Sequence, residues 1–143
     1  MKNTRARGAT LTELVMALSM CALLATITIA GSASLRNRSA VRAANTELVS
    51  ALHLARSSAL AESRVVALRF DTASGRALVL AHPDTLLDLP LGVWYAVTLS
   101  ATRDSIAYGP TGRGYGAANT TITIRRRSAA DTIVVSRLGR VKN

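Results

Sequence analysis

Cysteine and histidine are scarce in this chain, which has one cysteine, Cys21, and two histidines among 143 residues. A single cysteine excludes an intrachain disulfide, and one cysteine with two histidines cannot assemble a zinc cluster. The fold must therefore be held by packing and hydrogen bonds. Acidic residues are also few, with 8 Asp and Glu against 18 Lys and Arg, so the formal net charge is +10. This balance favours anionic partners such as nucleic acid, lipid headgroups or acidic protein surfaces.

Signals for catalysis are missing as well. The sequence has no Gly-x-Ser-x-Gly elbow and no pair of metal ligands at helical spacing. The glycine-rich residues 112–116 lack the Gly-Lys-Ser/Thr of a phosphate loop, and they lead into a predicted strand rather than a helix. His53 and His82 are interpreted as surface or structural side chains. We therefore expect a protein that is not an enzyme and that uses no cofactor and no metal.

Long apolar runs are limited to one, residues 11–30, which follow a short basic segment, residues 1–8. A helix of 20 residues spans roughly 30 Å, about the thickness of a bilayer's hydrocarbon core. The positive charge before the run predicts a cytoplasmic N-terminus and an exported C-terminal part. The sequence thus predicts a membrane-spanning helix over residues 9–31.

One carboxylate, Glu13, lies near the start of this apolar run. A charge inside a membrane segment is costly unless it stays hydrated at the interface or is paired. Glu13 is the fifth residue after Gly8, the glycine that closes the basic segment.

Basic leader, glycine, carboxylate spacing and apolar run together resemble the class III leader of type IV pilins and type II secretion pseudopilins. The resemblance implies that a prepilin peptidase cuts between Gly8 and Ala9, which makes residues 1–8 a leader peptide. It also implies that Ala9 is N-methylated, and that Glu13 pairs with the N-terminal amine of a neighbouring subunit during assembly. Ala9 stands where the family usually has Phe.

Two other interpretations of the N-terminal segment remain open. Residues 31–33, Gly-Ser-Ala, could form the cleavage site of an ordinary secretory signal, or the segment could be an uncleaved anchor. An ordinary signal usually has an apolar region of roughly 7–15 residues, which is shorter than the run here and would not contain Glu13.

The segment after the apolar run predicts a long amphipathic helix, residues 32–64, since no proline or glycine occurs from Ser34 to Arg64. Apolar residues recur at steps of three and four and form one stripe on a helical wheel. The stripe consists of Val41, Ala44, Leu48, Leu52, Ala55 and Ala59. Arg38, Arg42, His53 and Arg56 lie on one flank, either as a solvated face or as a contact for neighbouring subunits or an anionic ligand.

The remainder, residues 65–143, predicts a β-rich region. The expected strands are residues 65–70, 76–81, 92–99, 105–108, 120–126 and 132–136. A loop is expected to begin at His82, a glycine-rich loop is expected over residues 108–119, and residues 128–131 are expected to connect the last two strands. A long helix followed by hairpins predicts an α+β fold, in which the helix stripe packs on a small antiparallel β-sheet head.

Within pilin-like proteins, most of the chain resembles the FimT/GspH group of minor pilins and pseudopilins. The resemblance is carried by residues 45–59, 65–68, 108–112, 121–124 and 133–141. It implies a pilin-like head over residues 32–143 behind the anchor, with assembly into a type IV pilus or a type II secretion pseudopilus. The implied partners are other pilin or pseudopilin subunits, prepilin peptidase and the inner membrane. The implied location is a single-pass inner-membrane protein with its head in the periplasm or at a filament tip.

The C-terminus is strongly basic, with six cationic side chains in the last nineteen residues: Arg125, Arg126, Arg127, Arg137, Arg140 and Lys142. Such patches bind nucleic-acid phosphates without sequence choice. Residues 139–142, Gly-Arg-Val-Lys, resemble the Gly-Arg-x-Arg motif that the FimT branch links to DNA capture, with Lys142 in place of the second arginine. Two interpretations follow: a pilus-associated DNA-binding subunit for DNA uptake, or a solvated basic tail.

Overall fold

The computed structural model describes residues 10–115 and 119–142, and it leaves the side chains of residues 26–31 undescribed. The chain divides into two compact units, Met1–Leu35 and Arg36–Asn143. Helix α1 (Leu11–Ala61) contributes to both units. The predicted leader, residues 1–8, and Ala9 lie outside the described residues.

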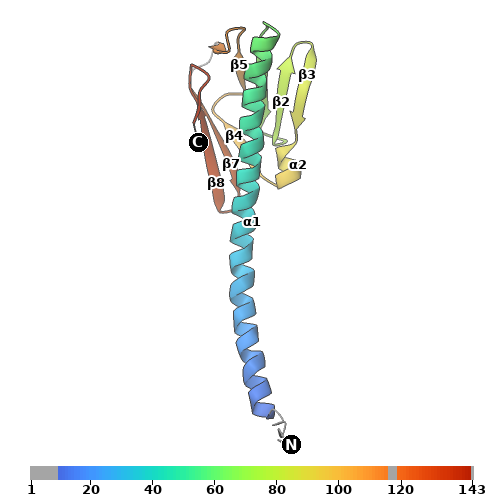
Figure 1. Ribbon diagram of the computed structural model, residues 1–143, viewed down its shortest axis with the longest axis vertical. Coiled ribbons are helices and arrows are strands. Elements are labelled where there is room, and N and C mark those ends of the chain that lie inside the picture. Colours follow the sequence, from blue (N-terminus) through green and yellow to red (C-terminus); the bar gives the residue numbers. More distant parts are fainter. Residues whose placement is uncertain (1–9, 116–118, 143) are drawn as a thin grey trace, which may run out of the picture. The chain divides into compact units, whose positions relative to one another are not determined.

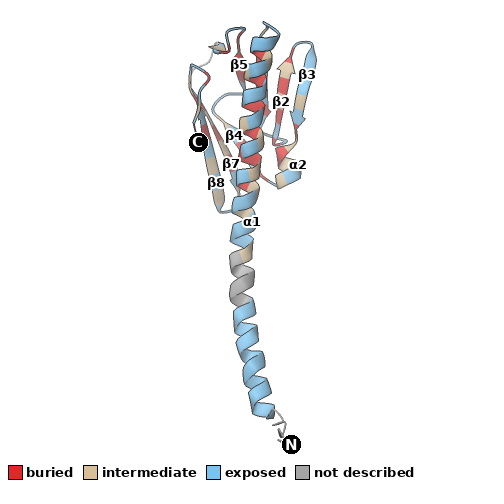
Figure 2. Ribbon diagram, in the orientation of Figure 1, coloured by how far each residue is buried: buried red, intermediate tan, exposed pale blue. Residues whose placement is uncertain are grey.

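In the first unit, α1 is exposed along its residues 11–25, which Figure 2 draws in pale blue. Leucine, valine and methionine side chains from Leu11 to Leu24 are all more than half exposed. Among the described residues, no helix is long and apolar enough to cross a membrane. The predicted spanning helix over residues 9–31 therefore stays a prediction.

In the second unit, the remainder of α1 buries one face, and the predicted stripe is confirmed. All six stripe residues, Val41, Ala44, Leu48, Leu52, Ala55 and Ala59, are at most 2% exposed. The helical period explains this result, because steps of three and four keep side chains on one face. Ala51 and Asn45 are also buried on this face. Neither was part of the predicted stripe.

Two antiparallel sheets pack with this part of α1, so the prediction of a single small sheet is wrong (Figure 1). The five-stranded sheet has the order β3-β2-β1-β5-β6, and the four-stranded sheet has the order β4-β7-β8-β9. The chain changes sheet between β4 and β5, since β4 pairs with β7 whereas β5 pairs with β1. The strands are β1 (Val66–Asp71), β2 (Arg76–Ala81), β3 (Asp84–Leu89), β4 (Thr98–Ala101), β5 (Ser105–Tyr108), β6 (Gly114–Tyr115), β7 (Thr120–Arg126), β8 (Ala129–Val135) and β9 (Val141–Lys142).

Four of the predicted strands are confirmed closely: β1, β2, β5 and β7. In β7 the alternation of threonine and isoleucine puts Ile122 and Ile124 in the core, where neither is exposed. The buried apolar residues of α1 and of both sheets together form one hydrophobic core. The α+β class and the helix-on-sheet packing are therefore as expected.

The predicted strand over residues 92–99 is wrong in its first half, where the chain forms a short helix, α2 (Leu91–Tyr95). Pro90 precedes α2 as its N-cap residue, and Ala96 ends it in the left-handed conformation with φ 51°. The backbone N–H of Gly92 donates a hydrogen bond to the carbonyl oxygen of Gly75 at 2.9 Å. A Cβ at position 92 would lie 2.8 Å from the carbonyl oxygen of Ser74, so the close packing of two backbones decides the conformation here.

Three predicted connections are shorter than expected. The loop predicted from His82 contains β3, a largely exposed edge strand whose Asp88 pairs with Arg76 of β2. The glycine-rich loop contains β6, and the connection over residues 128–131 is limited to Arg127 and Ser128 because β8 begins at Ala129. These strands are defined by their pairing partners, and their own sequences alternate weakly.

Candidate functional site

The first predicted site residue that the structure describes is Glu13, in the first turn of α1. The backbone N–H of Thr10 donates to Glu13 Oε2 at 3.1 Å, and the backbone N–H of Glu13 donates to Thr10 Oγ1 at 3.3 Å. This reciprocal pattern is a capping box, which satisfies amide groups that a helix N-terminus leaves without partners. The sequence Thr10-Leu11-Thr12-Glu13 has the spacing of such a box, and the sequence analysis missed it. Gly8 and Ala9 are not described.

The six cationic residues near the C-terminus do not form one patch. Strand pairing puts Arg126 opposite Ala129 at one end of the β7–β8 hairpin, whereas Lys142 lies opposite Val134. Five residues of strand advance about 17 Å, so the two groups lie near opposite ends of the four-stranded sheet. One group is the C-terminal cluster: Arg137, Arg140 and Lys142.

All three side chains of the C-terminal cluster are exposed; Arg137 and Arg140 lie in a tight turn over residues 136–140, and Lys142 lies in β9, which follows the turn. The backbone N–H of Ser136 donates to the carbonyl oxygen of Arg140 at 2.9 Å, and the Ser136 hydroxyl accepts from the N–H of Arg140 at 3.1 Å. Gly139 adopts φ +74°, and a Cβ there would lie 2.7 Å from Cε1 of Tyr108. The glycine of the Gly-Arg-Val-Lys segment is thus required by packing and backbone conformation.

An exposed aromatic side chain lies close to the C-terminal cluster. Gly114 packs against the backbone of Arg137, since a Cβ at position 114 would lie 2.7 Å from the Arg137 carbonyl oxygen. The next residue, Tyr115, is 64% exposed. Cationic side chains beside an exposed tyrosine can contact phosphates and stack on an unpaired base.

Tyr108 supports this end of the molecule from inside the core, with no exposed surface. Burial raises the pKa of its phenol, and the positive charge of Arg56 opposes that rise. The phenol oxygen is buried and has no hydrogen-bond partner among the described residues. The role of Tyr108 here is packing, because Gly139 lies directly against its ring.

The other group, Arg125, Arg126 and Arg127, lies near two further arginines on α1. The sequence did not predict that these residues of α1 and of the C-terminus come together. Arg38 and Arg42 line a hollow of about 420 Å³ together with residues 128–131. We define the hairpin cluster as Arg38, Arg42, Arg125, Arg126 and Arg127, of which all but the half-buried Arg126 are exposed. The ion pairs of the described residues use Arg64 and Arg76, and none uses the hairpin cluster. The helical flank noted in the sequence was the available signal.

No constellation suited to metal binding occurs in residues 10–115 and 119–142, where no three histidine, cysteine or acidic side chains come together. His53 and His82 are both exposed, in agreement with their interpretation as surface residues. Cys21 is an exposed free thiol. The features of the described surface that are suited to binding a partner are therefore its cationic clusters and its exposed apolar side chains.

Comparison with known proteins gives two kinds of match. A family model described as type II transport protein GspH matches residues 44–139. The crystal structure of the type IV minor pilin FimU from Pseudomonas aeruginosa strain PAO1 in space group P21 superposes with a TM-score of 0.63 at 18% identity, covering 73% of this chain and 88% of FimU. FimU in space group P65 gives a TM-score of 0.60 at 17% identity, covering 71% and 90%. A search of the curated proteins gave no match.

Proposed function

The chain belongs to the GspH family of type II transport proteins and is a minor pilin or pseudopilin subunit, and we propose that it works as a membrane-anchored structural part of a filament. FimU, whose fold is similar to that of this chain, is a type IV minor pilin. The proposed action is mechanical: the apolar half of α1 packs among the corresponding helices of other subunits, and the head is displayed outside.

The observation that carries this proposal is the exposure of the first half of α1. Leu11 is 83%, Met16 73%, Met20 70% and Leu23 67% exposed, on the same helix whose second half buries its apolar face completely. Burying such side chains is favourable by roughly 1.5–3 kcal/mol each, so a surface of this kind needs a partner. Lipid before assembly and neighbouring α1 helices after assembly would both supply one.

Glu13 fits this proposal because it is the carboxylate in that exposed apolar segment. In the isolated chain its carboxylate is engaged by Thr10. A neighbouring subunit's N-terminal amine would offer a full positive charge in place of a neutral amide donor, and charge-assisted hydrogen bonds are roughly twice as strong as neutral ones. We propose that docking exchanges the internal cap for this intersubunit pair.

Processing by prepilin peptidase is the part of the proposal that can be tested most directly. Full-length precursor is incubated with the peptidase, and the N-terminus of the product is sequenced. The expected product starts at Ala9, and a Gly8→Val precursor remains uncut. A product starting at Ser34 would instead assign the segment to an ordinary secretory signal, and an uncut wild-type chain would assign it to a plain anchor.

A second candidate function, capture of DNA for uptake, is favoured by the C-terminal cluster. Arg137 and Arg140, on the turn over residues 136–140, and Lys142, in β9, are all exposed, and Tyr115 nearby is exposed as well. Lysine keeps the charge of the arginine expected at position 142 but lacks its bidentate geometry, so phosphate contacts there would be weaker.

Salt-dependent DNA binding by the full chain in detergent tests this second function. Arg140→Ala and Lys142→Ala should each lower the slope of log K against log salt by about one, since each removes one phosphate contact. Arg69→Ala removes the same charge from an exposed site on β1 and serves as the control. An unchanged slope in the first two variants, or an equal loss in the control, rejects the C-terminal cluster as the binding surface.

A further inference from the structure

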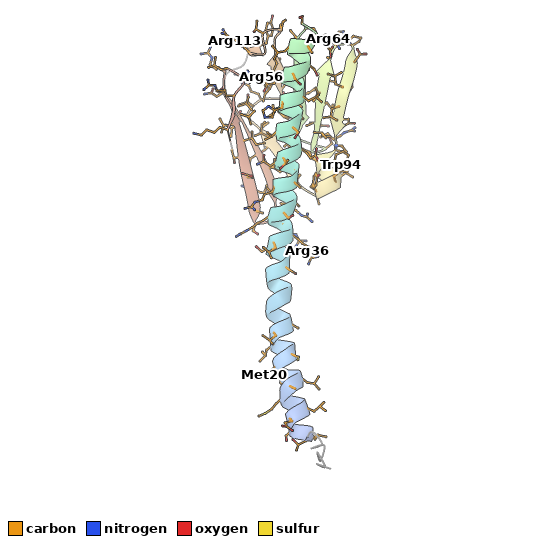
Figure 3. The ribbon with its side chains drawn as sticks, viewed as in Figure 1. Met20, Arg36, Arg56, Arg64, Trp94 and Arg113 are labelled. Carbon is orange, nitrogen blue, oxygen red and sulfur yellow. The ribbon has the colours of Figure 1, made fainter. Side chains whose placement is uncertain are left out.

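The hairpin cluster lies at the end of residues 36–143 that also presents the chain's one tryptophan, Trp94. Thr98 of β4, which follows α2 closely, pairs with Arg125 of β7, and its hydroxyl donates to the Arg125 carbonyl oxygen at 3.3 Å. Helix α2 therefore ends three residues before the point where β4 pairs with Arg125 of the hairpin cluster. Figure 3 shows Trp94 at this end of the unit and Arg113 at the opposite end.

This end of the unit combines exposed apolar side chains with arginines that form no ion pair among the described residues. Val93 is 78% and Trp94 56% exposed on α2, with no covering element in the described chain. The five arginines of the hairpin cluster form no ion pair with the described acidic residues. Exposed tryptophan with clustered arginine is the composition of a membrane-interface surface, where the indole lies at headgroup level and the cations meet anionic lipid.

The hollow between α1 and the β7–β8 turn has the size and polarity for a charged headgroup. It measures about 420 Å³ and is lined by the two arginines of α1 and by residues 128–131. The acidic side chain in that lining, Asp131, accepts a hydrogen bond from Asn45 Nδ2 and another from the backbone N–H of Thr132. A phosphate entering the hollow would therefore contact Arg38 and Arg42. The carboxylate of Asp131 is already engaged by the hydrogen bonds from Asn45 and Thr132.

The order of residues along the chain brings this surface close to lipid if the anchor is in the membrane. Arg38 comes eight residues after the end of the apolar run, residues 11–30. So short a connection keeps Arg38 within reach of the headgroup layer that adjoins the hydrocarbon core. The exported side of the predicted anchor is the side on which the head would meet that layer.

We propose that the end of the head formed by the hairpin cluster and α2 docks on anionic phospholipid headgroups. Arg38, Arg42 and the arginines of the β7–β8 turn bind lipid phosphates, and Trp94 and Val93 enter the interface. This docking would hold the head against the bilayer before the subunit joins a filament. The inference rests on the membrane anchor in the proposed function, and the anchor can be measured separately.

Trp94 is itself the probe for the test, because no other tryptophan contributes to the emission. The full-length chain is reconstituted into vesicles of phosphatidylcholine alone and of phosphatidylcholine with phosphatidylglycerol. The expected result is a shift of Trp94 emission to shorter wavelength, with quenching by brominated lipid, only where phosphatidylglycerol is present. Added salt should reverse both signals, since screening weakens attraction between exposed charges.

Arginine variants identify the surface. Arg38→Ala and Arg42→Ala should each lower the ratio of docked to undocked heads about fivefold, because one cation near an anionic surface is worth about one kcal/mol. Arg113→Ala removes the same charge at the far end of the unit and should leave the emission shift unchanged. Loss of the shift in Arg113→Ala to the same degree would reduce the effect to net charge and overturn the proposal.

Flotation of the vesicles separates this inference from the proposed anchor. A chain that does not float with neutral vesicles overturns the anchor and the docking that depends on it. A chain that floats but has the same Trp94 emission in both lipids overturns the docking alone. An emission shift that follows the protein-to-lipid ratio, and not the phosphatidylglycerol content, assigns the surface to a neighbouring copy and also overturns lipid docking.

Discussion

The side-chain amide of Asn45, on α1, donates a hydrogen bond from Nδ2 to Oδ2 of Asp131, on β8, at 2.5 Å. Asn45 is 4% exposed and interrupts the apolar face of the helix. The bond joins two elements far apart in the sequence and fixes where the β7–β8 hairpin lies along α1. It therefore also fixes the wall of the hollow that contains Arg38 and Arg42.

Breaking this bond should destabilise the fold measurably. Asp131→Ala leaves the buried amide of Asn45 without its acceptor, and such a loss costs about 1–3 kcal/mol. Asn45→Ala should cost a similar amount, and the double variant less than the sum of the two. Chemical unfolding of the full chain in detergent measures all three, with Asp104→Ala, exposed between β4 and β5, as the control. Strictly additive losses would show that the two side chains do not interact.

Gly139→Ala should destabilise the turn that carries the C-terminal cluster. The alanine would be strained at φ +74°, and its Cβ would lie 2.7 Å from the Tyr108 ring. Strain of this kind costs about 1–3 kcal/mol. Gly109→Ala is the matched control, because its Cβ would have no neighbour closer than 3.5 Å. Thermal unfolding of the two variants should differ clearly, and equal melting temperatures would contradict the described turn.

Tyr108→Phe should stabilise the chain by about 1 kcal/mol, because it removes a buried hydroxyl that has no partner. It should also reduce the loss of stability at alkaline pH. Burial raises the pKa of the folded-state phenol above its unfolded value of about 10. The neutral phenol's contribution is therefore complete below about pH 10 and is lost as pH rises toward the folded-state pKa.

Melting temperatures of wild type and Tyr108→Phe between neutral and alkaline pH check this prediction. Tyr115→Phe changes an exposed tyrosine and should follow the wild type throughout. If Tyr108→Phe loses stability at alkaline pH as steeply as wild type does, another group is responsible for the loss.

Substitutions in the capping box should separate the two roles of Glu13. Glu13→Gln keeps an oxygen acceptor for the Thr10 N–H but removes the charge, so the helix should form while incorporation into filaments falls. Thr10→Val removes the hydroxyl that caps the Glu13 N–H and keeps the carboxylate. Incorporation is measured by immunoblotting of sheared filaments, with helix content from circular dichroism. Normal incorporation of Glu13→Gln would show that assembly does not need the charge.

Much of the fold could be predicted because its signals are local. The stripe from Val41 to Ala59 follows the 3.6-residue period, and the alternation in β7 follows the two-residue period of a strand. The prediction of a strand over residues 92–99 failed in its first half because the apolar residues Val93, Tyr95, Val97 and Leu99 recur at every second position, as they would in a strand. The contact of Gly92 with the turn at Gly75 instead imposes α2.

The sequence by itself determined the helix stripe, most strands, the family to which the chain is similar and the excess of positive charge. Those features depend on periodicity and composition, which neighbouring residues carry. Only the tertiary structure decided how the arginines are grouped. The β7–β8 register separates Arg126 from Lys142, and the packing of that hairpin on α1 brings Ser128, in its turn, close to Arg38. Distances between residues far apart in the sequence are set by strand pairing and core packing, so no local pattern in the sequence could show that Arg38 and Arg42 lie beside the β7–β8 turn.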